Sequence, residues 1–115
     1  MKYSIIVPVY NRPDEIGELL ESLCSQTETD FEVIVVEDGS QIPCKDVCEK
    51  FASILDLHYY NKENSGPGMS RNYGAERSAG DYIIVLDSDV VLPDGYLAAI
   101  NRELNQHPVA AFGGP

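Results

Sequence analysis

Three runs of β-branched and aliphatic residues in this chain each stop abruptly at a polar turn. They occupy residues 4–9, 31–36 and 82–86, and each is followed by a stretch whose apolar residues recur at helical spacing. Continuous apolar runs of this kind are typical of strands buried on both faces of a parallel sheet. The pattern therefore predicts an α/β fold with a mostly parallel, Rossmann-like sheet flanked by helices.

Spacing and end signals place the remaining elements. Helices are expected at residues 13–26 and 44–51, and a third at residues 69–79 follows a loop rich in glycine and proline. Gly80 is expected to close that third helix in the left-handed conformation. The other expected elements are a helix that opens at Pro93-Asp94 and strands at residues 55–60 and 109–112.

Polar residues follow three of the expected strands. They are Tyr10-Asn11, Glu37-Asp38 and Asp87-Ser88-Asp89. Ligands of open α/β sheets bind beyond the carboxyl ends of the strands, and parallel strands bring those ends to one edge. We therefore expect the three polar turns to converge on one crevice.

The Asp87-Ser88-Asp89 turn carries the sharpest chemical signal. A turn placed directly after a strand can aim two carboxylates and a hydroxyl at one point, where the two negative charges repel each other. A hard divalent cation such as Mg²⁺ or Mn²⁺ relieves that repulsion and leaves coordination positions for the oxygens of a diphosphate. The alternative is that Asp89 caps the helix that follows.

Two further residues suit a nucleotide. The Asp38 carboxylate, followed by a glycine, can accept a hydrogen bond from the imide nitrogen of a base, although an ordinary Asp-Gly turn would look the same. Arg71 lies in the first turns of the third helix, where backbone amides already favour anions. Its alternative role is a surface ion pair with Glu76 or Asp81.

His58 and His107 lie far from these turns and are assigned no chemistry.

Charge and cysteine content exclude several classes of protein. The net charge of −11 is dispersed along the chain, so nucleic acid is not expected as a partner. Three cysteines without metal or disulfide spacing indicate a reducing compartment. No apolar stretch approaches the roughly 20 residues of a membrane span, and a cytoplasmic location is expected.

Taken as an ordered set, these motifs resemble those of the family 2 glycosyltransferases. The resemblance covers nearly the whole chain. The segments that carry it are Ser4 to Asn11, Glu37-Asp38-Gly39-Ser40, Gly66 to Asn72 and Asp87-Ser88-Asp89. It implies a GT-A type fold, a nucleoside diphosphate sugar as donor, with a UDP-sugar expected, Mg²⁺ or Mn²⁺, and inversion at the anomeric carbon. It also implies a role in cell-wall or polysaccharide synthesis.

The resemblance implies roles for individual positions as well. Asp38 matches the acid that meets the base, and Arg71 matches a position near the nucleotide. Asp87 and Asp89 match the pair that contacts ribose and metal, with Asp89 the more direct metal ligand and Ser88 between them in the donor site. The positions that match the nucleoside pocket are Pro8, Tyr10 and Asn11.

The chain departs from the family pattern in two ways. Glu37 stands where the family often has aspartate, which matters little if Asp38 makes the contact. The catalytic base and acceptor pocket lie later in the family's domain, so residues 1–115 are expected to be the donor-binding part of a domain truncated at its C-terminus. Without a base within reach of the acceptor hydroxyl, slow turnover or none is expected.

Three other readings compete with this one. A signalling receiver would place paired acids after the first strand, and a nucleotidyltransferase would have a basic glycine-rich loop there; Tyr10-Asn11-Arg12-Pro13 is neither. A non-catalytic sugar-nucleotide-binding module fits the same residues. The sequence leaves the catalytic residue, the sugar and the acceptor unassigned.

Overall fold

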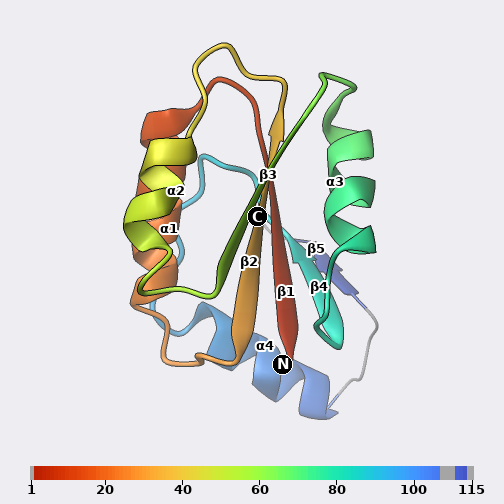
Figure 1. Cartoon of the computed structure of the whole chain (residues 1–115). Coiled ribbons are helices and arrows are strands. Elements are labelled where there is room, and N and C mark those ends of the chain that lie inside the picture. Colours follow the sequence, from red (N-terminus) through yellow and green to blue (C-terminus); the bar gives the residue numbers. More distant parts are fainter. Residues whose placement is uncertain (1, 107–110, 114–115) are drawn as a thin grey trace.

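The computed structural model of the protein describes residues 2–106 and 111–113 and contains one five-stranded sheet in the order β3-β2-β1-β4-β5. Every neighbouring pair of strands is parallel (Figure 1). The strands are β1 (Tyr3–Val9), β2 (Phe31–Asp38), β3 (Leu57–Lys62), β4 (Tyr82–Val85) and β5 (Ala111–Gly113). The helices are α1 (Pro13–Cys24), α2 (Lys45–Phe51), α3 (Pro67–Glu76) and α4 (Tyr96–Gln106).

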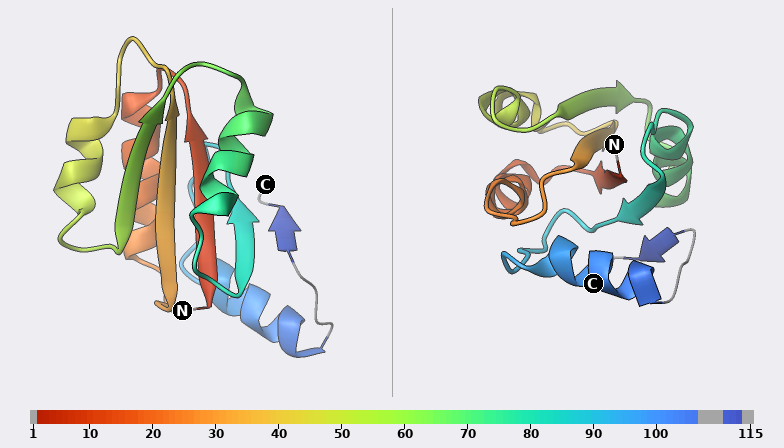
Figure 2. Two further views of the ribbon diagram at one scale, coloured as in Figure 1. Left: turned by 45° about the vertical axis from the view of Figure 1, so that its right-hand side comes forward. Right: turned by 90° about the horizontal axis from the view of Figure 1, so that it is seen from below.

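Helices cover both faces of the sheet, which explains the continuous apolar runs. α1 and α2 lie on one face and α3 on the other, as Figure 2 shows from below. Ile5 and Val7 of β1 belong to the larger core, which α1, α2 and α4 share, whereas Ile6 belongs to a smaller core under α3. Since successive strand residues point to opposite faces, one uninterrupted run fills both cores.

The predicted α/β architecture is confirmed, with shifts at element ends. β3 extends to Lys62 instead of ending at residue 60, because Lys62 pairs in register with Asp38. α3 begins at Pro67 and ends at Glu76, and α4 begins at Tyr96. The predicted fifth strand at residues 109–112 overlaps β5, but residues 109 and 110 lie outside the described part of the chain.

The predicted left-handed Gly80 is wrong. The described residues with positive φ are Asn11, Gly39 and Gly66, and α3 ends at a C-cap on Arg77. Gly80 is required for a different reason, namely a close approach of two backbones. A Cβ atom there would lie 2.6 Å from Ser4 Oγ and 2.7 Å from the Ser4 nitrogen, while the Gly80 N–H donates to Ser4 Oγ at 2.8 Å.

This close approach predicts that Gly80→Ala destabilises the chain. The added methyl group must push the 78–80 turn away from β1, which we expect to lower the free energy of unfolding by about 2 kcal/mol. Gly95→Ala is the matched control, because nothing lies within 4 Å of a Cβ at that position. Urea unfolding of both variants checks the prediction, and equal stabilities would contradict it.

Among the described residues, no helix is long and apolar enough to cross a membrane.

Candidate functional site

A cleft of about 250 Å³ opens where the carboxyl ends of β1 and β4 meet the start of α3. Its position is the one that an open parallel sheet offers a ligand. Segments far apart in the sequence line it, so the fold has brought the acidic turn, the third helix and the first strand together. The lining residues are Pro8, Arg12, Pro67, Arg71, Val85, Asp87, Ser88 and Asp89.

The acidic turn reaches this cleft because β4 stops at its edge. The Leu86 amide donates to the Ile6 carbonyl at 3.0 Å and its side chain is fully buried, so the chain emerges from the sheet at the next residue. Asp87 and Asp89 are exposed. Asp89 does not cap α4, which begins only at Tyr96. Both carboxylates are therefore free to face a ligand or a hard cation.

Arg71 supplies positive charge to the same cleft. It is exposed, and within the described part of the chain it makes no ion pair, so the alternative pairing with Glu76 or Asp81 is absent there. The second arginine of the cleft, Arg12, is held by Glu15 at 3.0 Å. Sequence reasoning treated Arg12 only as part of a turn. A cleft lined by two carboxylates and by the Arg71 guanidinium can hold a metal ion together with a phosphate.

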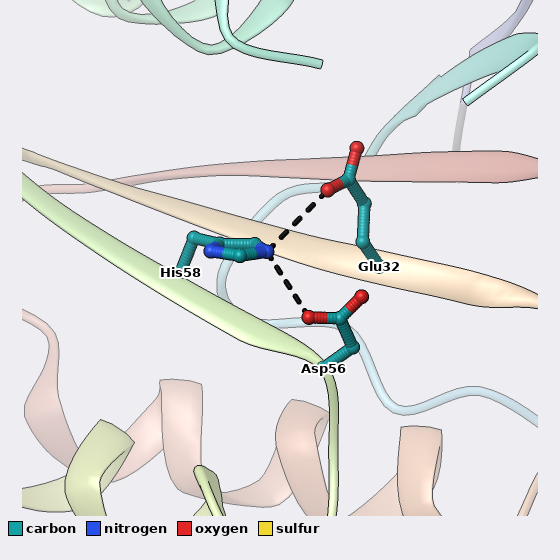
Figure 3. Close-up of side chains that lie close together, drawn as sticks. All are labelled: Glu32, Asp56 and His58. Atoms are coloured by element: carbon teal, nitrogen blue, oxygen red, sulfur yellow. Dashed lines mark ion pairs between the residues drawn. The ribbon is translucent and has the colours of Figure 1, made fainter. Parts of the chain in front are cut away.

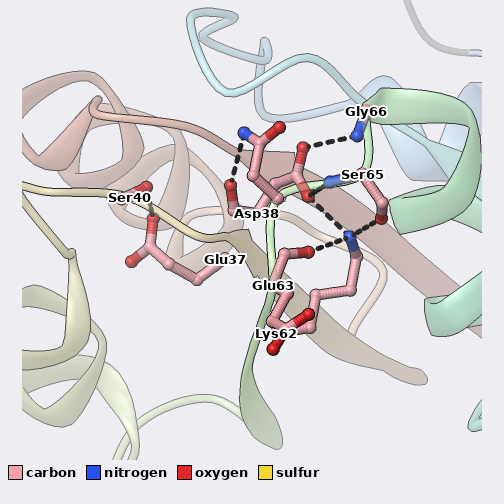
Figure 4. Close-up of polar contacts among 8 residues, drawn as sticks. Glu37, Asp38, Ser40, Lys62, Glu63, Ser65 and Gly66 are labelled. Carbon is pink, nitrogen blue, oxygen red and sulfur yellow. Dashed lines mark hydrogen bonds and ion pairs between the residues drawn. The ribbon is translucent and has the colours of Figure 1, made fainter.

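Asp38 lies outside the cleft lining and is 5% exposed. Figure 4 shows its carboxylate surrounded by the segment that leads into α3. Oδ1 accepts hydrogen bonds from Lys62 Nζ at 2.5 Å and the Ser65 amide at 2.9 Å, and Oδ2 accepts one from the Gly66 amide at 3.0 Å. Since Gly66 directly precedes α3, Asp38 fixes the start of the helix that carries Arg71.

A carboxylate has about four acceptor positions, and three of those on Asp38 are filled by its own chain. One position therefore stays available for a further donor. Lys62 was missed in the sequence because the predicted strand stopped short of it. What places Lys62 beside Asp38 is the register of β3 against β2, and this register is known only from the structure of the sheet.

The surroundings of Asp38 also set its proton affinity. Burial acts to raise the pKa of this carboxyl, but hydrogen bonds from Lys62, Ser65 and Gly66 together with the Lys62 charge outweigh burial and hold the pKa below its ordinary value. Because the pKa is lower in the folded than in the unfolded chain, the stabilisation is present above the unfolded-state pKa. It is lost as the pH falls through the folded-state pKa.

We therefore predict that Lys62→Met destabilises the chain at neutral pH by about 2 kcal/mol, since the buried carboxylate loses its cation but keeps two amide donors. The difference from the unsubstituted chain should shrink as the pH falls from neutral through the ordinary aspartate range and below it, because Asp38 then becomes protonated. Urea unfolding across that range measures it. Lys45→Met, at an exposed lysine, is the control, and a pH-independent difference would contradict the assignment.

Tyr10 and Asn11 follow β1 as predicted, but neither lines the cleft. Tyr10 is 49% exposed. Asn11 has φ 53°, and its Oδ1 accepts hydrogen bonds from the Gln41 and Ile42 amides at 2.8 and 3.0 Å. Its side chain thus holds the turn after β2 against the end of β1.

A parallel α/β sheet with an acidic turn and an arginine at its carboxyl edge is found in several classes of ligand-binding domain, and the comparisons with known proteins show to which of them this chain belongs. The model of the glycosyl transferase family 2 matches residues 4–115. The chain therefore belongs to the family 2 glycosyltransferases, and its fold is of the GT-A type.

Individual relatives support the same assignment. A glycosyltransferase of Haemophilus influenzae with no assigned activity is 46% identical over 109 residues, which are 95% of this chain and 36% of the relative. The poly(ribitol-phosphate) β-N-acetylglucosaminyltransferase TarS of Staphylococcus aureus is 40% identical over 93 residues, covering 77% of this chain and 16% of TarS. The chain thus spans little more than a third, or less, of the length of these relatives.

Solved structures agree with the fold. A crystal structure of S. aureus TarS with UDP-GlcNAc superimposes with a TM-score of 0.87 at 36% identity, covering 93% of this chain and 32% of that one. The mannosyltransferase PcManGT of Pyrobaculum calidifontis, solved with GDP-Man and Mn²⁺, gives a TM-score of 0.83 at 25% identity, covering 90% of this chain and 32% of that one.

Proposed function

We propose that this chain supplies the donor site of a metal-dependent, inverting glycosyltransferase that uses a nucleoside diphosphate sugar, with a UDP-sugar as the expected donor. The observation that carries the proposal is the cleft at the carboxyl edge of the sheet, which Asp87, Ser88 and Asp89 line together with Arg71. Relatives of similar fold were solved with UDP-GlcNAc and with GDP-Man and Mn²⁺, which supports a sugar nucleotide as the ligand.

The donor set of the cleft fits Mg²⁺ or Mn²⁺. Asp89, with Asp87 beside it, offers exposed carboxylate oxygens, which hard divalent cations prefer, and the open cleft leaves room for water and phosphate oxygens. When bound, such an ion stabilises the charge that develops on the departing diphosphate. Arg71, which lines the same cleft, contributes to the same end by binding phosphate oxygens.

The remaining residues position the nucleoside. Asp38 keeps one acceptor position for the imide N–H of a base, and its bonds to residues 62–66 hold it ionised and in place. Pro8 reaches the cleft itself, whereas Tyr10 and Asn11 stand at the end of β1 between the cleft and the turn after Asp38. The proposed nucleoside path therefore runs from the acidic turn along the ends of β1 and β2.

The transfer step also requires a base that removes the proton of the acceptor hydroxyl. None of the cleft residues is assigned that role, and the acceptor is left open. A non-catalytic sugar-nucleotide-binding module is the second candidate, because donor binding alone accounts for the same residues.

The buried Cys44 and Cys48 are free thiols, which supports a reducing, cytoplasmic compartment as part of the proposal.

Thermal unfolding of the chain with UDP, GDP or CDP, each with Mn²⁺ and with EDTA, tests the proposal. A ligand that binds only the folded state stabilises it by about 2.7 kcal/mol at a hundredfold excess over Kd. We expect a shift with one nucleotide, UDP, that requires Mn²⁺. A folded sample that shifts with no nucleotide would contradict a donor site within this chain.

A further inference from the structure

A second group of metal-ligating side chains lies at the opposite end of the sheet from the cleft. Glu32 stands near the start of β2, Asp56 directly precedes β3, and His58 follows it in β3 (Figure 3). These are the amino ends of the strands, whereas the acidic turn follows the carboxyl end of β4. The proposed donor site makes no use of the three side chains.

Glu32 is held with one oxygen aimed into this group. Its side chain is almost fully buried, with the residue 3% exposed. Oε2 accepts hydrogen bonds from Ser4 Oγ at 2.6 Å and from the Ala79 amide at 2.7 Å, which fix the carboxylate plane. Within the described part of the chain Oε1 accepts no hydrogen bond, and it faces His58 Nε2 at 3.5 Å.

That 3.5 Å separation is too long for an N–H···O hydrogen bond, which spans about 2.7–3.2 Å. A protonated His58 would form an ion pair with Glu32 at this distance, and a neutral His58 could share a zinc ion with it, because two ligands each about 2.1 Å from a tetrahedral ion lie about 3.4 Å apart. His58 Nε2 lies 3.1 Å from Asp56 Oδ1, and all three ligand atoms lie within 4.8 Å of one another. Asp56 is half exposed and can close the longest edge by a side-chain movement.

We propose that Glu32 Oε1, Asp56 Oδ1 and His58 Nε2 bind a zinc ion. An imidazole nitrogen with two carboxylates favours zinc over Mg²⁺, which prefers oxygen ligands throughout, so this site differs in chemistry from Asp87 and Asp89. Ser4 and Ala79 orient the buried ligand from behind, as the outer partners of metal ligands commonly do. The ion ties the edge strand β3 to β2 and stabilises the fold, whether or not the cleft binds a nucleotide.

Titration of the metal-free chain with Zn²⁺ by calorimetry, in excess Mg²⁺, tests this proposal. Because an exposed thiol also binds zinc, the Cys24→Ser background is used throughout. We expect one zinc per chain, a raised unfolding temperature and, with Co²⁺ in place of zinc, visible absorption of a tetrahedral ion. Asp89→Ala should leave all three readouts unchanged.

Two variants each remove one of the three proposed zinc ligands, and a third variant, the control, changes a histidine outside the site. His58→Ala should abolish saturable binding, and Asp56→Asn, which keeps the backbone carbonyl that accepts from Val33, should weaken it at least tenfold. His107→Ala removes the other histidine of the chain and should bind as before. The proposal is overturned if no zinc binds, if binding survives both ligand variants, or if Asp89→Ala abolishes it. A folded Asp56→Asn protein keeps the test valid should His58→Ala fail to fold.

Discussion

Asp89→Ala should bind UDP on the order of 100-fold more weakly than the unsubstituted chain in the presence of Mn²⁺, a loss of about 2.7 kcal/mol. Asp89 is exposed in the cleft and is the carboxylate that we assign as the more direct metal ligand. Without it the ion loses its main protein contact, and the diphosphate meets the negative charge of Asp87 with less compensation. Calorimetry with UDP and Mn²⁺, and again with EDTA, measures the effect.

The expected loss is confined to the metal-dependent part of binding. In EDTA the variant and the unsubstituted chain should bind UDP equally weakly, and their stabilities should agree within about 0.5 kcal/mol because the side chain is exposed. Asp46→Ala, at an exposed acid in the first turn of α2, is the control for a simple change of net charge. If Asp89→Ala and Asp46→Ala bind UDP alike, Asp89 is not a ligand of the metal.

Glu37→Ala should have the largest effect on stability, lowering the free energy of unfolding by about 3–5 kcal/mol. Glu37 is fully buried at the end of β2. Its carboxylate accepts hydrogen bonds from the Cys44 amide at 2.7 Å, from the Tyr59 hydroxyl at 2.9 Å and from Ser40 Oγ. Removing the acceptor leaves a cavity and takes the partner from the buried Cys44 amide and from two partly buried hydroxyls, and a buried orphan donor costs about 1–3 kcal/mol.

Glu37→Gln is the matched control. The amide oxygen can still accept from Cys44 and Tyr59, and Ser40 can rotate its hydroxyl to accept from the new amide. We expect it to lose less than half as much stability as Glu37→Ala. Urea unfolding compares the two, and equal losses would show that charge, not hydrogen bonding, is what Glu37 contributes.

The same network shows what the Glu37 side chain holds together. It reaches both the N-cap of α2, at Cys44, and the neighbouring strand, at Tyr59. Burial is the larger cause and the Glu37 carboxylate the next of a raised pKa of Tyr59, so the phenol stays protonated and remains a hydrogen-bond donor. The departure noted in the sequence therefore has a structural consequence, although it leaves Asp38 free for its proposed contact.

The sequence predicted the sheet well because its signals are local. Strands such as β1 and β2 are buried on both faces, so each shows as an apolar run whatever the rest of the chain does. The cleft was predicted only in part. Parallel strands must bring their carboxyl ends to one edge, and the Asp87-Ser88-Asp89 turn does line the cleft there. The other two polar turns, Tyr10-Asn11 and Glu37-Asp38, do not line it.

The contacts that could not be predicted all depend on register and close packing. Lys62 meets Asp38 only because β3 continues two residues beyond its apolar pattern. His58, assigned no chemistry from the sequence, lies beside Glu32 because the register of β3 against β2 pairs His58 with Ile34, two residues after Glu32. Gly80 was read as a helix end, whereas a close approach to Ser4 requires it.

The most direct test of the donor site is NMR of the ¹⁵N-labelled chain with Mn²⁺, recorded with and without UDP. Because Mn²⁺ broadens the signals of nearby nuclei, the account predicts UDP-dependent broadening of the amides of residues 86–90 and 68–71, which border the cleft. Broadening near Glu32, Asp56 and His58 should not depend on UDP. UDP-dependent broadening centred on those three residues, or none anywhere, would contradict a sugar-nucleotide and metal site at the carboxyl edge of the sheet.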